Sequence, residues 1–172
     1  MTALFVIGGA RSGKSRYAQA RAEAAGESPV FVATAEAFDD EMRARIAQHR
    51  ADRDARWRTV EAPRDLPAAI DALNDGGAVV LVDCLTLWAS NLLLADADIP
   101  AATAGLCAAV ARFEGSLILV ANEVGLGIVP DNALARQFRD AAGQINQAVA
   151  ASADEVVLLT AGLPLTLKAR EA

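Results

Sequence analysis

The fold of this chain is decided by the stretch Gly8-Gly9-Ala10-Arg11-Ser12-Gly13-Lys14-Ser15. It matches the pattern G-x-x-x-x-G-K-[ST], directly after an apolar run and directly before an amphipathic one. Glycines let the backbone curl so that several N–H groups point at phosphate oxygens. Lys14 brings a positive charge to the β- and γ-phosphates, Ser15 offers a hydroxyl to Mg²⁺, and the following helix presents its positive end. The stretch therefore predicts a phosphate-binding loop for a nucleoside triphosphate.

Outward from this loop, short runs of branched apolar residues alternate with longer helical patterns, which is typical of a parallel sheet covered by helices on both faces. We expect strands at Leu4–Ile7, Val30–Ala33, Thr59–Glu61, Val79–Val82, Leu117–Ala121, Val156–Thr160 and Leu163–Lys168, the last as an antiparallel edge. We expect helices at Lys14–Ala25, Asp39–Arg53, Leu66–Asn74, Leu85–Leu94, Pro100–Phe113 and Asn132–Ala151. No repeat or linker interrupts the pattern, so we predict one α/β P-loop domain over residues 1–172.

The composition of the chain limits the classes of binding partner that we expect. The chain has 172 residues and a formal charge of −6, which disfavours general binding of nucleic acid or anionic lipid. No apolar run approaches the roughly 20 residues that span a bilayer, and no signal peptide is evident, so we expect a cytoplasmic protein without stable membrane insertion. The two cysteines, Cys84 and Cys107, lie in apolar stretches and predict neither a disulfide nor a thiolate metal site.

A carboxylate at the tip of another strand is the second part of such phosphate sites. Asp83 directly follows the apolar run Val79–Val82 and is the candidate for holding Mg²⁺, directly or through water. The alternative is an Asp that caps the helix beginning near Leu85. The two roles are compatible, and the phosphate loop favours the metal.

The only histidine, His49, lies in a predicted helix that is rich in arginine. Met42, Ile46, His49 and Arg53 share one helix face, so the imidazole points where the apolar side chains point. Six arginines fall within sixteen positions, at Arg43, Arg45, Arg50, Arg53, Arg56 and Arg58. Such a cluster suits a polyphosphate, but the same pattern is typical of a solvated arginine face and of a histidine buried in the core.

Longer motifs carry a resemblance to a known family. They are G-G-A-R-S-G-K-S-R at 8–16, A-T-A at 33–35, D-D-E-M-x-x-R-I-x-x-H-R at 39–50, W-R-T-V-E-A-P at 57–63, D-C-L-T-L-W-x-S-N-L-L at 83–93, N-E-V-G-L-G-I-V-P at 122–130, L-A-R-x-F-R-D-x-x-G-x-x-N-Q at 134–147 and A-D-E-V at 153–156. Over nearly the whole chain, they resemble the bifunctional adenosylcobinamide kinase and adenosylcobinamide-phosphate guanylyltransferase of cobalamin biosynthesis. The histidine segment and N-E-V-G-x-G-I-V-P are the specific ones.

The resemblance implies a three-layer P-loop NTPase fold close to the RecA recombinase core, assembled as a homotrimer. It implies two reactions: phosphorylation of adenosylcobinamide by GTP or ATP, and transfer of GMP from GTP to give adenosylcobinamide-GDP and pyrophosphate. His49 would carry the GMP covalently, with Lys14 beside the phosphates. Further contacts to the nucleotide are implied for the whole loop Gly8, Gly9, Ala10, Arg11, Ser12, Gly13, Lys14 and Ser15, for Ala33, Thr34 and Ala35, for Arg50, Ala51, Asp52 and Arg53, and for Glu61 and Asp83.

Two other functions remain to be distinguished. A P-loop kinase of another small alcohol would use His49 only structurally. A regulatory GTP-binding module would need a guanine-selecting N-K-x-D element, and neither lysine of the chain, Lys14 or Lys168, stands in one. Gly125 and Gly127 either let the backbone approach a ligand or simply turn it.

Overall fold

The computed structural model describes residues 2–36 and 53–169. Their core is a seven-stranded sheet with strand order β3-β2-β4-β5-β1-β6-β7. The strands are β1 Thr2–Gly8, β2 Val30–Ala33, β3 Arg58–Glu61, β4 Val79–Asp83, β5 Ser116–Asn122, β6 Glu155–Thr160 and β7 Leu163–Lys168. All neighbours run parallel except β6 and β7, which form an antiparallel pair at the edge.

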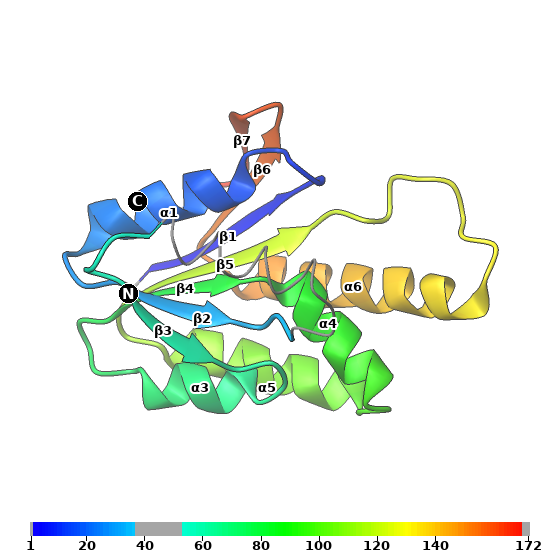
Figure 1. Cartoon of the computed structure of the whole chain (residues 1–172), viewed down its shortest axis with the longest axis horizontal. Helices are drawn as coiled ribbons and strands as arrows, with labels where there is room; N and C mark the ends of the chain where they lie inside the picture. Colours follow the sequence, from blue (N-terminus) through cyan, green and yellow to red (C-terminus); the bar gives the residue numbers. More distant parts are fainter. Residues whose placement is uncertain (1, 37–52, 170–172) are drawn as a thin grey trace.

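Helices cover both faces of this sheet (Figure 1). Helix α1, Lys14–Ala25, packs on one face, where its buried Ala18 and Ala22 meet Leu4, Val6 and their neighbours on β4 and β5. The other face carries α3 Leu66–Ala72, α4 Leu85–Leu94, α5 Ile99–Arg112 and α6 Ala133–Ser152. Because successive strand residues point to opposite faces, β1 sends Phe5 to the four-helix side and Leu4 and Val6 to the α1 side.

The predicted α/β architecture, with its helices on both faces and its antiparallel edge, is confirmed. The boundaries moved where side chains cap helices. The α5 helix begins one residue before the predicted Pro100 because Asp98 accepts a hydrogen bond from the N–H of Ala101, and α6 begins after Asn132 because that side chain accepts from Ala135. The predicted helix Asp39–Arg53 lies almost wholly outside the described residues.

The prediction that α3 continues to Asn74 was wrong. The helix ends at Ala72, and the Asn74 side chain instead donates to the Arg112 carbonyl and accepts from the N–H of Glu114. This tertiary contact of Asn74 replaces the last helical turn. No local sequence pattern predicts such a contact.

Two further expectations concern the cysteines and membrane insertion. Cys84 and Cys107 are both free thiols, and burial raises the pKa of Cys84 to about 11. None of the helices in the described ranges combines the length and the apolar character that crossing a bilayer requires.

Candidate active site at the carboxyl edge of the sheet

The predicted phosphate loop runs from the end of β1 into the first turn of α1. Gly13, just before the helix, has φ +93°, in the left-handed region that only glycine enters without strain. A Cβ on Gly8 would lie 2.6 Å from both the Leu159 carbonyl oxygen and the Ser12 hydroxyl, so only glycine fits there. The loop is also held from outside, since the N–H of Gly162 in the β6–β7 turn donates to the Ser12 carbonyl at 2.8 Å.

The side chains of the loop include two cations and a buried hydroxyl. Lys14 Nζ lies over the loop and donates to the Gly9 carbonyl at 3.2 Å, while Arg11 is exposed at its tip. The Ser12 hydroxyl oxygen is buried and has no hydrogen-bond partner among the described residues. Buried polar atoms are normally satisfied, so this oxygen fits a loop that closes around a bound group. Ala10 and Ser15 complete the turn into α1.

The last residues of β1, β3, β4 and β5 all lie on the face of the sheet that carries α1. Val6, Leu81 and Val120, which stand two positions before Gly8, Asp83 and Asn122, belong to the core on the α1 side, so strand alternation places these strand ends on that face. Val60 packs against the core on the four-helix side, so its neighbour Glu61 also points to the α1 side. Gly8 pairs with Asn122 on the adjacent strand, and Asp83 lies one strand further. Neighbouring strands lie about 4.8 Å apart, which puts β4 roughly 10 Å and β3 roughly 19 Å from β1 across the sheet.

Asp83 is the last residue of β4, and in the structure it does not cap α4. Cys84, not Asp83, occupies the N-cap position of α4, and no side chain caps that helix. The junction after Asp83 is held by the fully buried Thr34, whose hydroxyl accepts from the N–H of Cys84 at 2.9 Å and donates to its carbonyl at 2.7 Å. Asp83 is half-buried at the sheet edge, next to Ala33 of β2.

The predicted contacts at Ala33, Thr34 and Ala35 follow β2 along the same edge. The Ala33 carbonyl accepts from Ala62, and the Thr34 carbonyl accepts from the Asn91 side chain at 2.7 Å. These groups therefore bind other parts of the protein and fix the strand end beside Asp83. Ala35 is half-buried after them.

The arginine cluster is only partly visible. His49, Arg50, Ala51 and Asp52 lie outside the described residues, as do Arg43 and Arg45. Arg53 stacks on the ring of Phe31 at 3.6 Å, on the α1 side of β2. Arg56 forms an ion pair with Asp54 at 2.7 Å, so its charge is matched locally rather than left for a polyphosphate.

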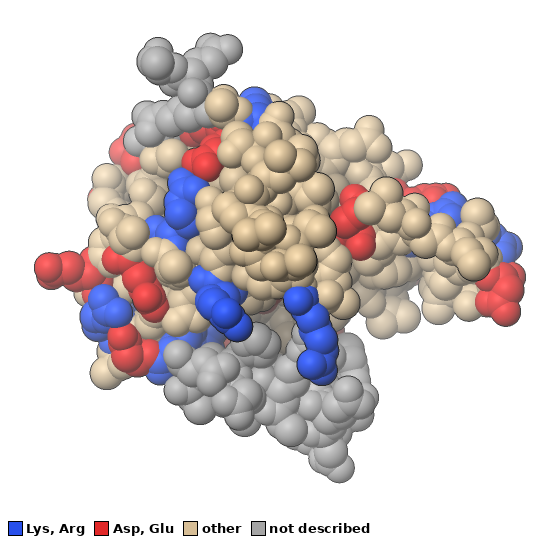
Figure 2. Space-filling model, turned by 90° about the horizontal axis from the view of Figure 1, so that it is seen from above, with Lys and Arg blue, Asp and Glu red and all other residues tan. Residues whose placement is uncertain are grey.

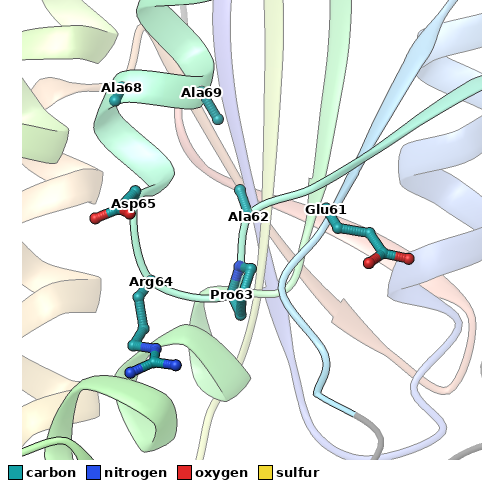
Figure 3. A pocket seen from close by; sticks show the side chains of 7 residues that line it. All are labelled: Glu61, Ala62, Pro63, Arg64, Asp65, Ala68 and Ala69. Atoms are coloured by element: carbon teal, nitrogen blue, oxygen red, sulfur yellow. The ribbon is translucent and has the colours of Figure 1, made fainter.

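Glu61 ends the outermost strand and borders an open hollow of about 580 Å³ (Figure 3). The other walls are Ala62, Pro63, Arg64, Asp65, Ala68 and Ala69, from the turn into α3 and its first residues. The turn is firmly held, because Trp88 donates to the Arg64 carbonyl at 2.8 Å and Asn91 donates to the Pro63 carbonyl at 2.9 Å. In the figure the Glu61 carboxylate points away from Arg64 and Asp65, so the hollow has no convergent polar groups.

Charge is distributed unevenly over the α1 side of the molecule. Figure 2 looks down on this side and shows an uncharged central area with lysine and arginine side chains along part of its border. The exposed residues of β7 contribute to the uncharged surface, with Leu163, Leu165 and Leu167 all more than half exposed. Figure 2 also shows acidic side chains on this side, so the surroundings of the uncharged area carry charges of both signs.

A magnesium ion fits the donors at this edge. Within residues 2–36 and 53–169, no three His, Cys, Asp or Glu side chains group closely enough to hold a metal by themselves. Mg²⁺ typically uses one or two protein oxygens and completes its shell with water and substrate phosphates. The Ser15 hydroxyl and the Asp83 carboxylate suit that mode of binding.

Asn122 and Glu123, the first two residues of the N-E-V-G-L-G-I-V-P motif, also lie at this edge, and the sequence analysis assigned them no role. The N–H of Glu123 donates to the Gly8 carbonyl at 3.1 Å, which joins the end of β5 to the start of the loop. The Glu123 carboxylate accepts from the N–H of Gly125 at 2.6 Å, so Gly125 takes part in a turn. The signal that could have found these residues was the N-E-V-G motif directly after a buried strand.

Comparisons with known proteins agree with this geometry. The family described as CobU, cobinamide kinase / cobinamide phosphate guanyltransferase, matches residues 4–167. The chain is 46% identical over 165 residues to the bifunctional adenosylcobalamin biosynthesis protein CobP of Pseudomonas aeruginosa, with 95% of each chain covered. It is 42% identical over 182 residues to the bifunctional adenosylcobalamin biosynthesis protein CobU of Salmonella typhimurium, with 96% of this chain and 99% of that protein covered.

Solved structures support the fold. An ATPase of the type III secretion system of pathogenic bacteria aligns with a TM-score of 0.59 and 14% identity, over 92% of this chain and 51% of that one. The chain thus spans about half of that ATPase, and the likeness concerns the fold alone. It confirms the predicted three-layer P-loop NTPase fold, and the family match confirms the resemblance seen in the motifs. The chain belongs to the cobinamide kinase / cobinamide phosphate guanyltransferase family.

Proposed function

We propose that this protein phosphorylates the aminopropanol hydroxyl of adenosylcobinamide with GTP or ATP, and then joins GMP from GTP to that phosphate. The products are adenosylcobinamide-GDP and pyrophosphate. The observation that carries the proposal is the phosphate loop at the start of α1, in a chain whose family match runs from residue 4 to residue 167. We place the enzyme in the cytoplasm, where nucleoside triphosphates are supplied.

In the kinase step the substrate hydroxyl attacks the γ-phosphorus, and the bond to the β-phosphate oxygen breaks. Backbone N–H groups of the loop and Lys14 would hold the β- and γ-phosphates and offset the charge on their oxygens. Ser15 and Asp83 would hold Mg²⁺, which supplies further neutralisation of phosphate charge when bound. Catalysis here requires positioning and charge rather than covalent chemistry by the protein.

In the transfer step a neutral His49 imidazole nitrogen would attack the α-phosphorus of GTP and release pyrophosphate. The phosphate of adenosylcobinamide phosphate then attacks the same phosphorus, the nitrogen–phosphorus bond breaks, and the imidazole is restored. Arg50, Ala51, Asp52 and Arg53, with Glu61, would contact the guanine nucleotide, as the family resemblance implies. His49 is the sole histidine of the chain and therefore the sole candidate for this covalent role.

The covalent step has a direct test. Protein incubated with GTP labelled at the α-phosphate should keep acid-labile, base-stable label after denaturation, because a phosphoramidate has that stability pattern. The variant His49→Asn should keep kinase activity and lose the label. Label that persists in His49→Asn would disprove the histidine route. If the wild-type protein takes up no label but keeps normal kinase turnover, the result favours a small-molecule kinase in which His49 is structural.

The phosphate loop is tested separately with Lys14→Ala. We expect this variant to lose both activities and most of its nucleotide affinity, because the β- and γ-phosphates lose their main cation. Arg112→Ala changes a cation that pairs with Asp71 on the four-helix side and serves as the control. Tight nucleotide binding in wild-type protein without any cobinamide-dependent turnover would favour a regulatory nucleotide-binding module instead.

We also propose that the protein is a homotrimer. Large apolar side chains are exposed on β7 and between β5 and α6, where Leu126 and Ile128 are 89% and 97% exposed. Exposed apolar area of this kind marks interaction surfaces. The number of copies is the one that the family resemblance implies, so sedimentation equilibrium should give three times the 17.9 kDa of one chain. A mass of a single chain at micromolar concentration would contradict the proposal.

A further inference from the structure

The connection between β5 and α6, residues 123–132, projects beyond the carboxyl ends of the strands. Figure 1 shows it in yellow, rising from the end of β5 toward the level of α1 before it returns to the start of α6. Its first residue is tied to the phosphate loop, since the N–H of Glu123 donates to the Gly8 carbonyl at 3.1 Å. This connection, called the β5–α6 loop below, therefore borders the place where the phosphates of a bound nucleotide would lie.

The middle of the β5–α6 loop is apolar and exposed. Leu126 and Ile128 have nearly their whole side chains in solvent, and Val129 and Leu134 are more than half exposed. These four make up half of the large apolar side chains that are exposed in the described part of the chain. Exposed apolar side chains that gather in one place mark a binding surface. The β5–α6 loop therefore has the character of a surface that a ligand or a partner covers.

Both ends of this loop are held by hydrogen bonds. At the start, the Glu123 carboxylate accepts from the N–H of Gly125 at 2.6 Å. At the end, the Arg136 guanidinium donates to the carbonyls of Pro130 and Asp131, at 2.9 and 2.8 Å. The apolar side chains are thus presented from fixed ends, which lowers the entropy cost of ordering the loop around a ligand.

Charge along the loop limits the class of ligand. Residues 124–130 contain no ionisable side chain, and carboxylates flank them at Glu123 and Asp131. Such a surface disfavours a phosphate and suits a large ligand that is mainly apolar and carries positive charge. Adenosylcobinamide has this character, because methyl groups and uncharged amides surround its corrin ring and the cobalt complex is a cation.

The length of the substrate's own side chain brings the corrin ring to this loop. The hydroxyl that attacks the terminal phosphate is joined to the ring by about seven bonds, which span roughly 8 Å when extended. Leu126 follows Glu123 by three residues, so the two Cα atoms are at most about 11 Å apart. A ring at the end of that side chain therefore comes within reach of Leu126 and Ile128. On the other flank of β1, the β6–β7 turn is closed against the Ser12 carbonyl by Gly162.

We propose that Leu126 and Ile128 bind the corrin ring of adenosylcobinamide and so position its hydroxyl at the phosphate loop. The inference rests on the proposed function and adds the residues that select a corrinoid over a small alcohol. Gly127, between them, has open space around an added Cβ. The peptide groups beside it are therefore accessible to the amides on the edge of the ring.

Binding of adenosylcobinamide, followed by its visible absorption, tests this role without turnover. The titration contains the Mg²⁺-bound GTP analogue whose β–γ bridging oxygen is replaced by NH. We expect Leu126→Ser/Ile128→Ser to raise the Kd for adenosylcobinamide about tenfold, because apolar area on the loop is no longer buried by the ring. The Kd for the nucleotide analogue should keep its wild-type value. Leu126→Ile/Ile128→Leu keeps the apolar area and should retain most of the affinity.

The matched control is Leu94→Ser. Leu94 is also an exposed leucine, 63% accessible, but it is the last residue of α4 on the four-helix side. This variant should bind adenosylcobinamide as wild type does.

A truncated substrate separates the ring from the hydroxyl. N-(2-hydroxypropyl)propanamide keeps the reacting hydroxyl and its amide chain but has no corrin ring. Its rate of phosphorylation, slow in either protein, should be the same for wild type and for Leu126→Ser/Ile128→Ser. The KM for adenosylcobinamide should rise in the variant.

The outcomes are distinguishable. An unchanged Kd for adenosylcobinamide in the double serine variant, or an equal loss of activity toward the truncated substrate, would overturn the role of the loop. A smaller mass than wild type in sedimentation equilibrium, with affinity restored at concentrations where the mass recovers, would assign the loop to a contact between copies and overturn it as well. Wild-type protein that binds the nucleotide analogue but no adenosylcobinamide would overturn the proposed function itself.

Discussion

At the scale of single residues, the phosphate loop depends on backbone freedom at Gly13. Its φ of +93° places it in the left-handed region, and an added Cβ would lie 3.2 Å from the Cα of Gly162. Both the dihedral angle and the close approach penalise any other residue. Gly9, four positions earlier, has open space around an added Cβ. The two glycines are thus a matched pair with different structural demands.

We predict that Gly13→Ala lowers the free energy of unfolding by about 1 to 2 kcal/mol, since alanine must adopt a left-handed conformation. Gly9→Ala should change that free energy by less than about 0.5 kcal/mol. Urea unfolding followed by circular dichroism measures both. Equal effects of the two substitutions would contradict this account of the loop.

Thr34 is a second residue whose role is local and specific. We predict that Thr34→Val costs about 1 to 3 kcal/mol of unfolding free energy, because the buried N–H of Cys84 loses its acceptor. Thr34→Ser keeps the hydroxyl and should cost less than the valine variant. Since Thr34 fixes the chain next to Asp83, valine should also weaken Mg²⁺-dependent nucleotide binding, as measured by titration calorimetry. If Thr34→Ser is as impaired as Thr34→Val, loss of the hydroxyl is not the cause of the effect.

At the scale of elements, the C-terminal end of α6 is closed by a side chain from β7. Lys168 Nζ donates to the carbonyls of Ala150, Ala151 and Ala153, so one ammonium satisfies several of the groups that a helix end leaves open. The cation also lies at the negative end of the helix dipole. This contact ties an edge strand, all of whose residues are exposed, to the body of the protein.

We predict that Lys168→Met destabilises the protein by about 1 kcal/mol, through loss of these hydrogen bonds and of the dipole interaction. Amide hydrogen exchange should accelerate in β7 and in the last turn of α6 before it changes in β1. Lys168→Arg keeps the charge and should retain most of the protection. Uniform acceleration over the whole sheet would show that the contact does not act locally.

At the scale of the whole molecule, an ion pair joins the first helix to the sixth strand, across most of the sequence. Arg21 NH2 lies 2.8 Å from Glu155 Oε2, and a second bond links NH1 to Oε1. The guanidinium lowers the pKa of Glu155 below its ordinary value of 4.5, and the carboxylate in turn raises the pKa of Arg21. The pair therefore favours folding only while Glu155 is ionised.

We predict that Glu155→Gln lowers the free energy of unfolding by about 1 kcal/mol at pH 7, because the pair is partly exposed to solvent. A carboxyl group with a lowered pKa in the folded state contributes fully above its unfolded value, near 4.5, and loses its contribution as the pH falls through the folded value. The difference between wild type and variant should therefore vanish in acid. Glu27→Gln, at an exposed position, is the control, and a difference independent of pH would exclude the ion pair as its cause.

Much of this protein was determined by its sequence alone. The loop at residues 8–15, the alternation of strands and helices, the antiparallel edge and the family all follow from local patterns and motifs, since backbone preference and hydrophobic period act over a few residues. The tertiary structure alone decided which strand ends meet. It inserted β5 between β1 and β4, so that Asn122 lies beside Gly8, more than a hundred residues away in sequence, and it placed the Thr34 hydroxyl against Cys84. Strand order and buried hydrogen bonds depend on packing between distant segments, and no local pattern encodes them.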